Sequence, residues 1–273
     1  MRWYVDKKTL NPRSGLNKQT FMKTRLLALC AFLASATALF ANDLPIVDEY
    51  DELSNDFRTR FEVAAEWKPV KNLSLSLAQE VRLKNMSSNL DRLYTTRDVS
   101  YKVYKYIKLG VSYSFHAMYK GADAAEQWQF RHRGRLHVTG SYGVNNWGMS
   151  LRVMPEVTYL DAPINPLEEV NPEWLMRTRF KVDYSFLDKP VDPYLSVEMF
   201  NPLKKVEDNT AWINRLRYTV GVEWSVDAQN KFDFYYLLEH NMGQEISHTD
   251  AAVVRTHQNG LNHNLGIKYK FVF

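Results

Sequence analysis

Hydrophobic and polar residues alternate along the last eleven positions of the chain. One side of an extended strand would carry His263, Leu265, Ile267, Tyr269, Phe271 and Phe273. The other side would carry Asn264, Gly266, Lys268, Lys270 and Val272. A strand that has one apolar face and ends on an aromatic residue is typical of outer-membrane barrels.

The same alternation recurs from Phe57 onward, in runs of about ten residues joined by polar turns, as in a series of hairpins. Pro155 interrupts one run, and we expect a bulge there because proline cannot donate to the ladder. The pattern predicts strands at 57–67, 73–83, 99–103, 109–115, 128–138, 147–159, 174–186, 194–200, 212–226, 232–240 and 263–273.

Short links alternate with longer ones between these strands. The short ones are 69–72, 140–146, 188–193 and 227–230, and the longer ones are 84–95, 118–127, 161–172 and 241–260. In bacterial barrels the short turns face the periplasm and the longer loops face the exterior. We therefore predict an all-β fold, a single antiparallel transmembrane β-barrel with short periplasmic turns and longer extracellular loops.

The number of strands depends on the acidic segment before Phe57. Single-chain bacterial barrels usually have an even number of strands. Either residues 44–50 form a weak first strand, which makes about twelve, or residues 42–56 pass through the lumen as a plug. Twelve is the preferred prediction, and ten is the alternative if a weak hairpin does not form.

Large aromatic residues gather at both ends of the predicted strands. Amphipathic rings are favoured at the two interfaces of a membrane. The predicted belts contain Trp67, Trp147 and Trp224 beside short turns, and Trp128, Tyr159, Trp174 and Trp212 beside longer loops.

Charged residues occupy the opposite face of the strands in rows. In hydrocarbon, Arg or Lys would cost about 2–4 kcal/mol each, so this face is expected to lie inside the barrel. Interior ion pairs would give it a structural role, whereas an open lumen would be a narrow channel that favours anions or small solutes. The predicted rows are Arg58, Arg60, Glu62, Glu80, Arg131, Arg133, Arg135, Arg177, Arg179, Arg215, Arg217, Glu223 and Glu239.

The N-terminal region resembles an export signal. Residues 26–41 are apolar and follow Lys23 and Arg25, which is the order of a signal peptide, so we assign residues 22–41 to it, with cleavage near Ala41. Residues 1–21 would be an upstream extension that is not native, and residues 42–273 the barrel. The only cysteine, Cys30, lies in the signal, so the mature chain would have no disulfide.

Composition and charge restrict the possible functions. With 45% hydrophobic residues the chain is far from the composition of a disordered protein. Residues 1–41 hold seven of the 35 Lys and Arg and one of the 31 Asp and Glu, so 28 and 30 remain and the mature net charge is −2. This balance gives no support to nucleic-acid binding.

No arrangement of residues points convincingly to catalysis. Outer-membrane lipid hydrolases need a His and a Ser two residues apart on one strand, and the sequence has no such pair; Ser247 and His248 are adjacent and would point to opposite faces. His257 and His263 lack a carboxylate or Cys at ligand spacing, so no metal or other cofactor is predicted. A lipid- or peptide-hydrolysing barrel and a loop-based binding or adhesion barrel remain the alternatives.

Several segments resemble an uncharacterised family of outer-membrane barrels grouped as domain of unknown function 2490. They are residues 61–68 followed by 73–77, residues 193–198, and residues 265–269. The resemblance covers nearly all of residues 44–273, implies the fold and an outer-membrane location, and brings no catalytic residues. As in similar barrels, Tyr269, Phe271 and Phe273 would be the C-terminal signal for the insertion machinery, and membrane lipids would be the other partner.

Overall fold

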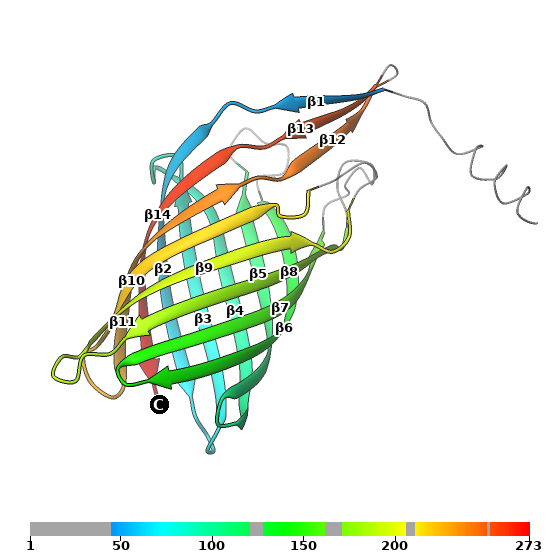
Figure 1. Cartoon of the computed structure of the whole chain (residues 1–273). Coiled ribbons are helices and arrows are strands. Elements are labelled where there is room, and N and C mark those ends of the chain that lie inside the picture. The colour runs from blue at the N-terminus through cyan, green and yellow to red at the C-terminus, as the bar shows by residue number, and fades with distance from the viewer. Residues whose placement is uncertain (1–44, 121–127, 162–170, 206–210, 250–251) are drawn as a thin grey trace, which may run out of the picture. The chain divides into compact units, whose positions relative to one another are not determined.

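The computed structural model describes residues 45–120, 128–161, 171–205, 211–249 and 252–273. Eleven of the described strands form a closed barrel (Figure 1). They are β2 (Ser54–Trp67), β3 (Leu73–Lys84), β4 (Asn89–Tyr104), β5 (Ile107–Tyr119), β6 (Trp128–Val144), β7 (Trp147–Leu160), β8 (Glu173–Tyr184), β9 (Val191–Pro202), β10 (Arg215–Ser225), β11 (Asn230–Asn241) and β14 (Gly260–Val272). The predicted all-β barrel is thus confirmed, although neither twelve nor ten strands form it.

The odd number of strands decides how the barrel closes. Each strand from β2 to β11 is antiparallel to the next, and β14 is antiparallel to β11. The first and last strands of an odd series run in the same direction, so β14 pairs with β2 in parallel, from Gly260↔Ser54 to Val272↔Glu66. The prediction of a wholly antiparallel barrel is therefore wrong at this one seam.

A second, three-stranded sheet accounts for the missing twelfth strand. β1 (Ile46–Tyr50) pairs in parallel with β13 (Val253–His257), which pairs with β12 (Gln244–His248). Described residues 45–50 are therefore neither a barrel strand nor a lumenal plug. The predicted loop at 241–260 contains the β12–β13 hairpin. The outer edge of β13 has unpaired backbone N–H and C=O groups, and β1 forms hydrogen bonds with them.

Two of the turns contain an asparagine whose backbone is left-handed. Asn72 has φ 72° and Asn145 has φ 52°, a region that asparagine enters more readily than most residues. β6 continues through Val144, so the link predicted at 140–146 shrinks to two residues. The loop predicted at 84–95 is likewise a turn of residues 85–88, where Asp56 accepts hydrogen bonds from the backbone N–H groups of Asn85 (3.3 Å) and Met86 (3.2 Å).

Pro155 does not produce the expected bulge. On one side of it the pairing of β7 with β8 continues without a shift. On the other side the ladder with β6 skips two residue pairs and resumes in the same register, from Arg135↔Glu156 to Val138↔Val153. Because Pro155 has no N–H group to donate, two residue pairs between β6 and β7 are lost, and no extra residue is inserted into the strand.

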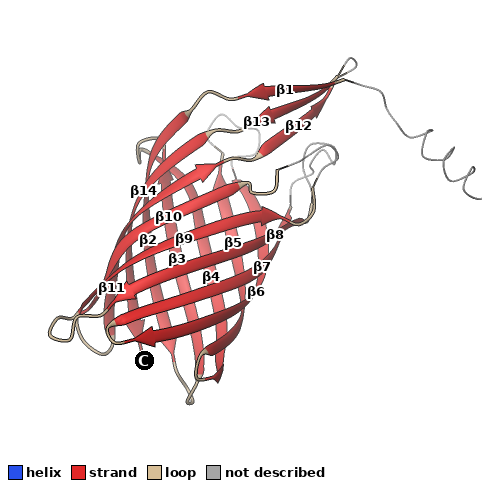
Figure 2. Ribbon diagram, in the orientation of Figure 1, coloured by secondary structure: helices blue, strands red, loops and turns tan. Residues whose placement is uncertain are grey.

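The burial pattern is the reverse of that of a soluble protein. Apolar side chains cover the outer wall, where Leu136 is 61% and Leu195 is 58% exposed, whereas Glu156 inside the barrel is 2% exposed. The strands wind obliquely around the interior (Figure 2), and the two-residue period sends successive side chains to opposite sides. Among the described residues, no helix is long and apolar enough to cross a membrane.

Glycines face large side chains at several places inside the wall. Gly266 lies directly across the ladder from Tyr235, and Gly221 lies across from Tyr194. A Cβ atom on Gly266 would come within 2.0 Å of the Tyr235 ring, and one on Gly221 within 2.7 Å of the Tyr194 ring. The missing side chains give the two rings the space that they occupy.

Gly266→Ala is expected to lower the free energy of unfolding by about 1–3 kcal/mol, because the Tyr235 ring must move from a packed position. Gly140→Ala is the matched control, since no atom lies within 4 Å of the Cβ that it would add. Urea unfolding of the two variants measures the difference. Equal stabilities would show that the ring contact contributes nothing.

Candidate functional site

The predicted charge rows all line the inside of the barrel. Arg58, Arg131 and Glu239 line a cavity of about 690 Å³, and Glu223 lines a neighbouring one of about 440 Å³. The other predicted row residues line the first cavity, the second, or both; they are Arg60, Glu62, Glu80, Arg133, Arg135, Arg177, Arg179, Arg215 and Arg217. The alternation along each strand is sufficient to place them, because the interior is the only polar side of the wall.

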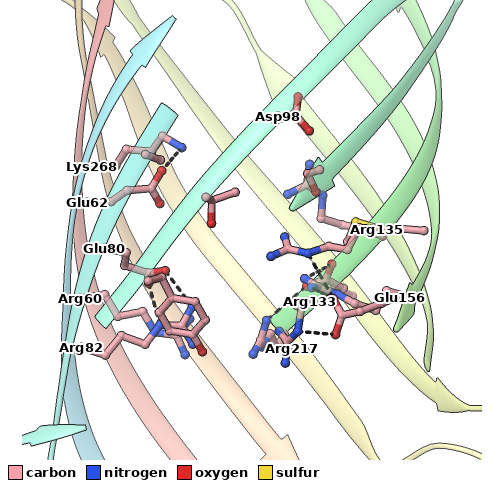
Figure 3. Close-up of a pocket in the computed structure, with 18 of the residues that line it drawn as sticks. Arg60, Glu62, Glu80, Arg82, Asp98, Arg133, Arg135, Glu156, Arg217 and Lys268 are labelled. Atoms are coloured by element: carbon pink, nitrogen blue, oxygen red, sulfur yellow. Dashed lines mark hydrogen bonds and ion pairs between the residues drawn. The ribbon is translucent and has the colours of Figure 1, made fainter. Parts of the chain in front are cut away.

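Glu156 on β7 is the centre of one cluster in this interior. Its carboxylate lies 3.2 Å from Arg133 Nε, 3.5 Å from Arg135 Nε and 2.9 Å from Arg177 Nη1. Of the three arginines, Arg177 donates a hydrogen bond to the carboxylate, whereas Arg133 Nε donates to the Thr158 hydroxyl over 2.9 Å. Charge attraction therefore accounts for the contacts of Arg133 and Arg135 with Glu156. Figure 3 shows Arg133, Arg135 and Glu156 together on one wall of the cavity. Three strands are thus joined through one buried side chain.

The cluster continues as an alternating belt of arginine and glutamate. Glu198 lies 2.9 Å from Arg177 Nη2 and 3.6 Å from Arg217 Nη1, and Arg217 also donates to Glu239. Arg60 Nη2 follows at 3.8 Å from Glu239. The strand register explains this order, because Arg217 lies directly across from Glu198 on one side and Glu239 on the other.

A further polar group lies on β3 and β4, next to the Arg60 end of this belt. Arg82 Nε donates to Glu80 over 2.7 Å, and its guanidinium lies 4.1 Å from the centre of the Tyr94 ring. Tyr94 in turn packs against the buried ring of His116. Figure 3 shows Glu80 and Arg82 beside Arg60, on the side of the view away from Glu156. No pattern in the sequence pointed to Tyr94 or His116, because both occupy ordinary positions within predicted or irregular strands.

The interior remains hollow despite these contacts. The larger cavity is lined near the loop ends of the strands by Arg58 and Arg131, and near the turn ends by Glu66 and Lys108. It therefore extends along most of the barrel. Fifteen Arg and Lys side chains line it against nine Asp and Glu side chains, so its walls carry a net positive charge.

The predicted aromatic belts lie on the outer surface. Trp67, Trp147 and Trp224 are at turn ends of their strands, and Trp128, Tyr159 and Trp174 are at loop ends. Trp212 is 75% exposed but precedes β10, so the strand predicted from residue 212 begins three residues later. On β14, Tyr269 and Phe271 belong to the outward-facing set and Phe273 is 66% exposed.

The three-stranded sheet holds a polar cluster that the sequence pattern did not reveal. Asp48 on β1 accepts from His257 Nε2 over 3.0 Å and from Arg255 Nη1 over 3.1 Å, and the ring of Tyr50 stacks on His257 with centroids 4.5 Å apart. The hydrogen bond from His257 lowers the pKa of the Asp48 carboxyl below its ordinary value. These contacts fasten β1 to β13.

The residues considered for catalysis are dispersed in the structure. Ser247 lies exposed on β12, while the side chain of His248 is outside the described part. His257 on β13 bonds to Asp48, and His263 on β14 bonds to the Tyr236 hydroxyl. Within the described ranges, no group of three or more His, Cys, Asp and Glu is placed to hold a metal ion.

Comparison with known proteins supports the resemblance seen in the sequence. Residues 57–248 match the model of the family described as Protein of unknown function (DUF2490). The chain belongs to this family. The match begins in β2 and ends in β12, so it covers ten of the eleven barrel strands and stops before the closing strand β14. No curated protein matches the chain.

Proposed function

We propose that this DUF2490 protein is an outer-membrane β-barrel whose interior is a narrow path for small anions. The observation that carries the proposal is the reversed burial: an apolar outer wall encloses ion-paired charges. Water would drive such an outer wall into a core, whereas lipid solvates it. A closed barrel also leaves no unpaired strand edge in the hydrocarbon region.

Sidedness follows from the connections. All the links at one end of the barrel, after β2, β4, β6, β8 and β10, are short, whereas at the other end the turn after β3 is short and the links after β5, β7, β9 and β11 are longer. The C-terminus lies at the end with the uniformly short links, which we assign to the periplasm. Sheet β1–β13–β12 would then face the exterior. Residues 1–44 lie outside the described part, so export through a signal at 22–41 stays a prediction, as does the upstream extension at 1–21. The partners proposed are membrane lipids and the barrel-insertion machinery.

The lumen supports a channel role over a purely structural one. A cavity of about 690 Å³ that is lined from loop ends to turn ends provides space for hydrated ions. The Arg and Glu belt narrows this space, so passage of large solutes is not expected. The excess of Arg and Lys on the walls would raise the local concentration of anions.

Purified full-length protein in planar lipid bilayers should give small conductance steps that favour chloride in a potassium chloride gradient. The sign of the reversal potential measures the preference, because a non-selective pore would give a potential near zero. Bilayers that stay sealed after insertion, verified by protease protection of the inserted barrel, would contradict the channel role and leave a structural barrel.

Arg215→Gln is expected to move the reversal potential toward zero. Arg215 lines the cavity, and no carboxylate among the described residues lies within ion-pair distance of it, so the change removes a net positive charge without breaking an ion pair. Lys71→Gln removes the same charge from an exposed turn and serves as the control. If the reversal potential did not change in Arg215→Gln, the positive charge of Arg215 would not contribute to ion selectivity.

A further inference from the structure

One level of the barrel wall carries cations without the glutamates that alternate elsewhere. Across neighbouring strands, Lys102 pairs with Lys108, Lys108 with Thr139, Thr139 with Arg152, and Arg152 with Arg179. This cationic row of Lys102, Lys108, Arg152 and Arg179 spans β4 to β8 near the short turns. Like charges directly opposite each other destabilise a ladder, and here two such pairs occur on one level.

Nearby carboxylates do not neutralise the row. Glu198 lies across from Arg179, but its oxygens are bound by Arg177 and Arg217. Asp98 is bound by His137. Among the described residues, none of the four cations of the row forms an ion pair, and Arg152 Nε donates only to the Thr139 hydroxyl over 3.1 Å. The guanidinium groups of Arg152 and Arg179 thus keep most of their donors available.

The row faces a cavity that is open to a ligand. This space of about 520 Å³ is lined by the row and also by Lys105 and Lys181, with Asp183 as its one carboxylate. Lys108, Arg152 and Arg179 also line the larger interior cavity, so the two spaces adjoin. A small anion entering from the turn end would reach the guanidinium groups without crossing the Arg and Glu belt.

We infer that the turn end of the barrel interior binds a small, multiply charged phosphoryl anion. Two facing guanidinium groups can each donate a pair of hydrogen bonds to phosphate oxygens. The ammonium group of lysine does not offer this paired geometry. A ligand with a single negative charge could not balance both guanidinium charges. Bound phosphate would also replace the repulsion between Arg152 and Arg179 by two attractions. The site needs no ion flow through the barrel, so it stands apart from the proposed channel.

Inorganic pyrophosphate is the probe, titrated calorimetrically into the full chain in detergent at low ionic strength. The wild-type protein should bind it, and Arg152→Gln/Arg179→Gln should weaken binding at least about tenfold, which corresponds to the loss of one charge-assisted contact. The control Lys71→Gln/Lys189→Gln removes the same charge from exposed turns at the same end and should leave affinity within about twofold.

The shift of the melting temperature on adding pyrophosphate is a second measurement. A double variant that is merely less stable would still show this shift if it bound pyrophosphate. Pyrophosphate should raise the melting temperature of the wild type and of the control, and not that of the double variant. Dihexanoyl phosphatidic acid in place of pyrophosphate distinguishes a lipid headgroup from a soluble phosphate as the source; binding of either that depends on the two arginines supports the site.

Three results would overturn the inference: no binding by the wild type, equal binding by the double variant, or equal loss in the control. The channel is tested separately. Sealed bilayers with retained pyrophosphate binding would reject the channel and keep the site, and conducting bilayers without binding would do the reverse.

Discussion

Replacing Glu156 by glutamine is expected to lower the free energy of unfolding by about 3–5 kcal/mol, because the change leaves buried charges without their counter-charge. Arg133, Arg135 and Arg177 all lie within 3.5 Å of its carboxylate, and Glu156 is 2% exposed. Glutamine has nearly the same shape, so the loss would come from charge and not from a cavity. Urea unfolding in phospholipid vesicles measures it.

Glu173→Gln is the matched control for this variant. Glu173 lines the same cavity, and within the described part of the chain it forms no ion pair. It should therefore stay within about 0.5 kcal/mol of the wild type, as is usual for a substitution away from a specific contact. If Glu156→Gln were as stable as Glu173→Gln, the Arg and Glu belt would not be what holds the strands together.

Val220→Arg is expected to destabilise the barrel in lipid by about 2–4 kcal/mol, the cost of arginine at the middle of a bilayer on the outer wall of a barrel. Val220 lies at the midpoint of β10 and is 54% exposed between Leu195 and Tyr236. At an equally exposed position in water, arginine would change stability little. Unfolding of the variant in vesicles therefore tests the membrane location directly.

Val70→Arg controls for the substitution itself. Val70 is 59% exposed in the turn between β2 and β3, beyond the expected hydrocarbon region, so arginine there should be nearly neutral. If Val220→Arg were as well tolerated as Val70→Arg, the outer wall would not face lipid, and the proposal of an outer-membrane barrel would fail.

The alternation of residue types was enough to place the interior. Arg131, Arg133 and Arg135 point inward because every second side chain of a strand shares a face, a local property that needs no knowledge of neighbouring strands. The same rule predicted that Trp147 and Leu265 point outward, and both are exposed on the outer wall. The same rule misplaced the start of the turn predicted at 140–146, because alternation continues to Val144 and the turn depends on the left-handed backbone of Asn145.

The sequence did not predict which charged side chains inside the barrel form ion pairs with each other. Glu156 meets Arg133, Arg135 and Arg177 because of the register between β6, β7 and β8, and a shift of two residues would keep every side chain on the same face while changing each ion pair. For the same reason the rows of arginines seen along single strands did not reveal that Arg152 and Arg179 face each other across the wall.

By itself the sequence determined an all-β barrel with an apolar outer face, a charged inner face and aromatic ends, because these depend on a two-residue period along each strand. Only the tertiary structure decided that eleven strands close with β14 parallel to β2, and that β1 joins the β12–β13 hairpin. Closure and pairing depend on contacts between segments up to about two hundred residues apart, which no local pattern encodes.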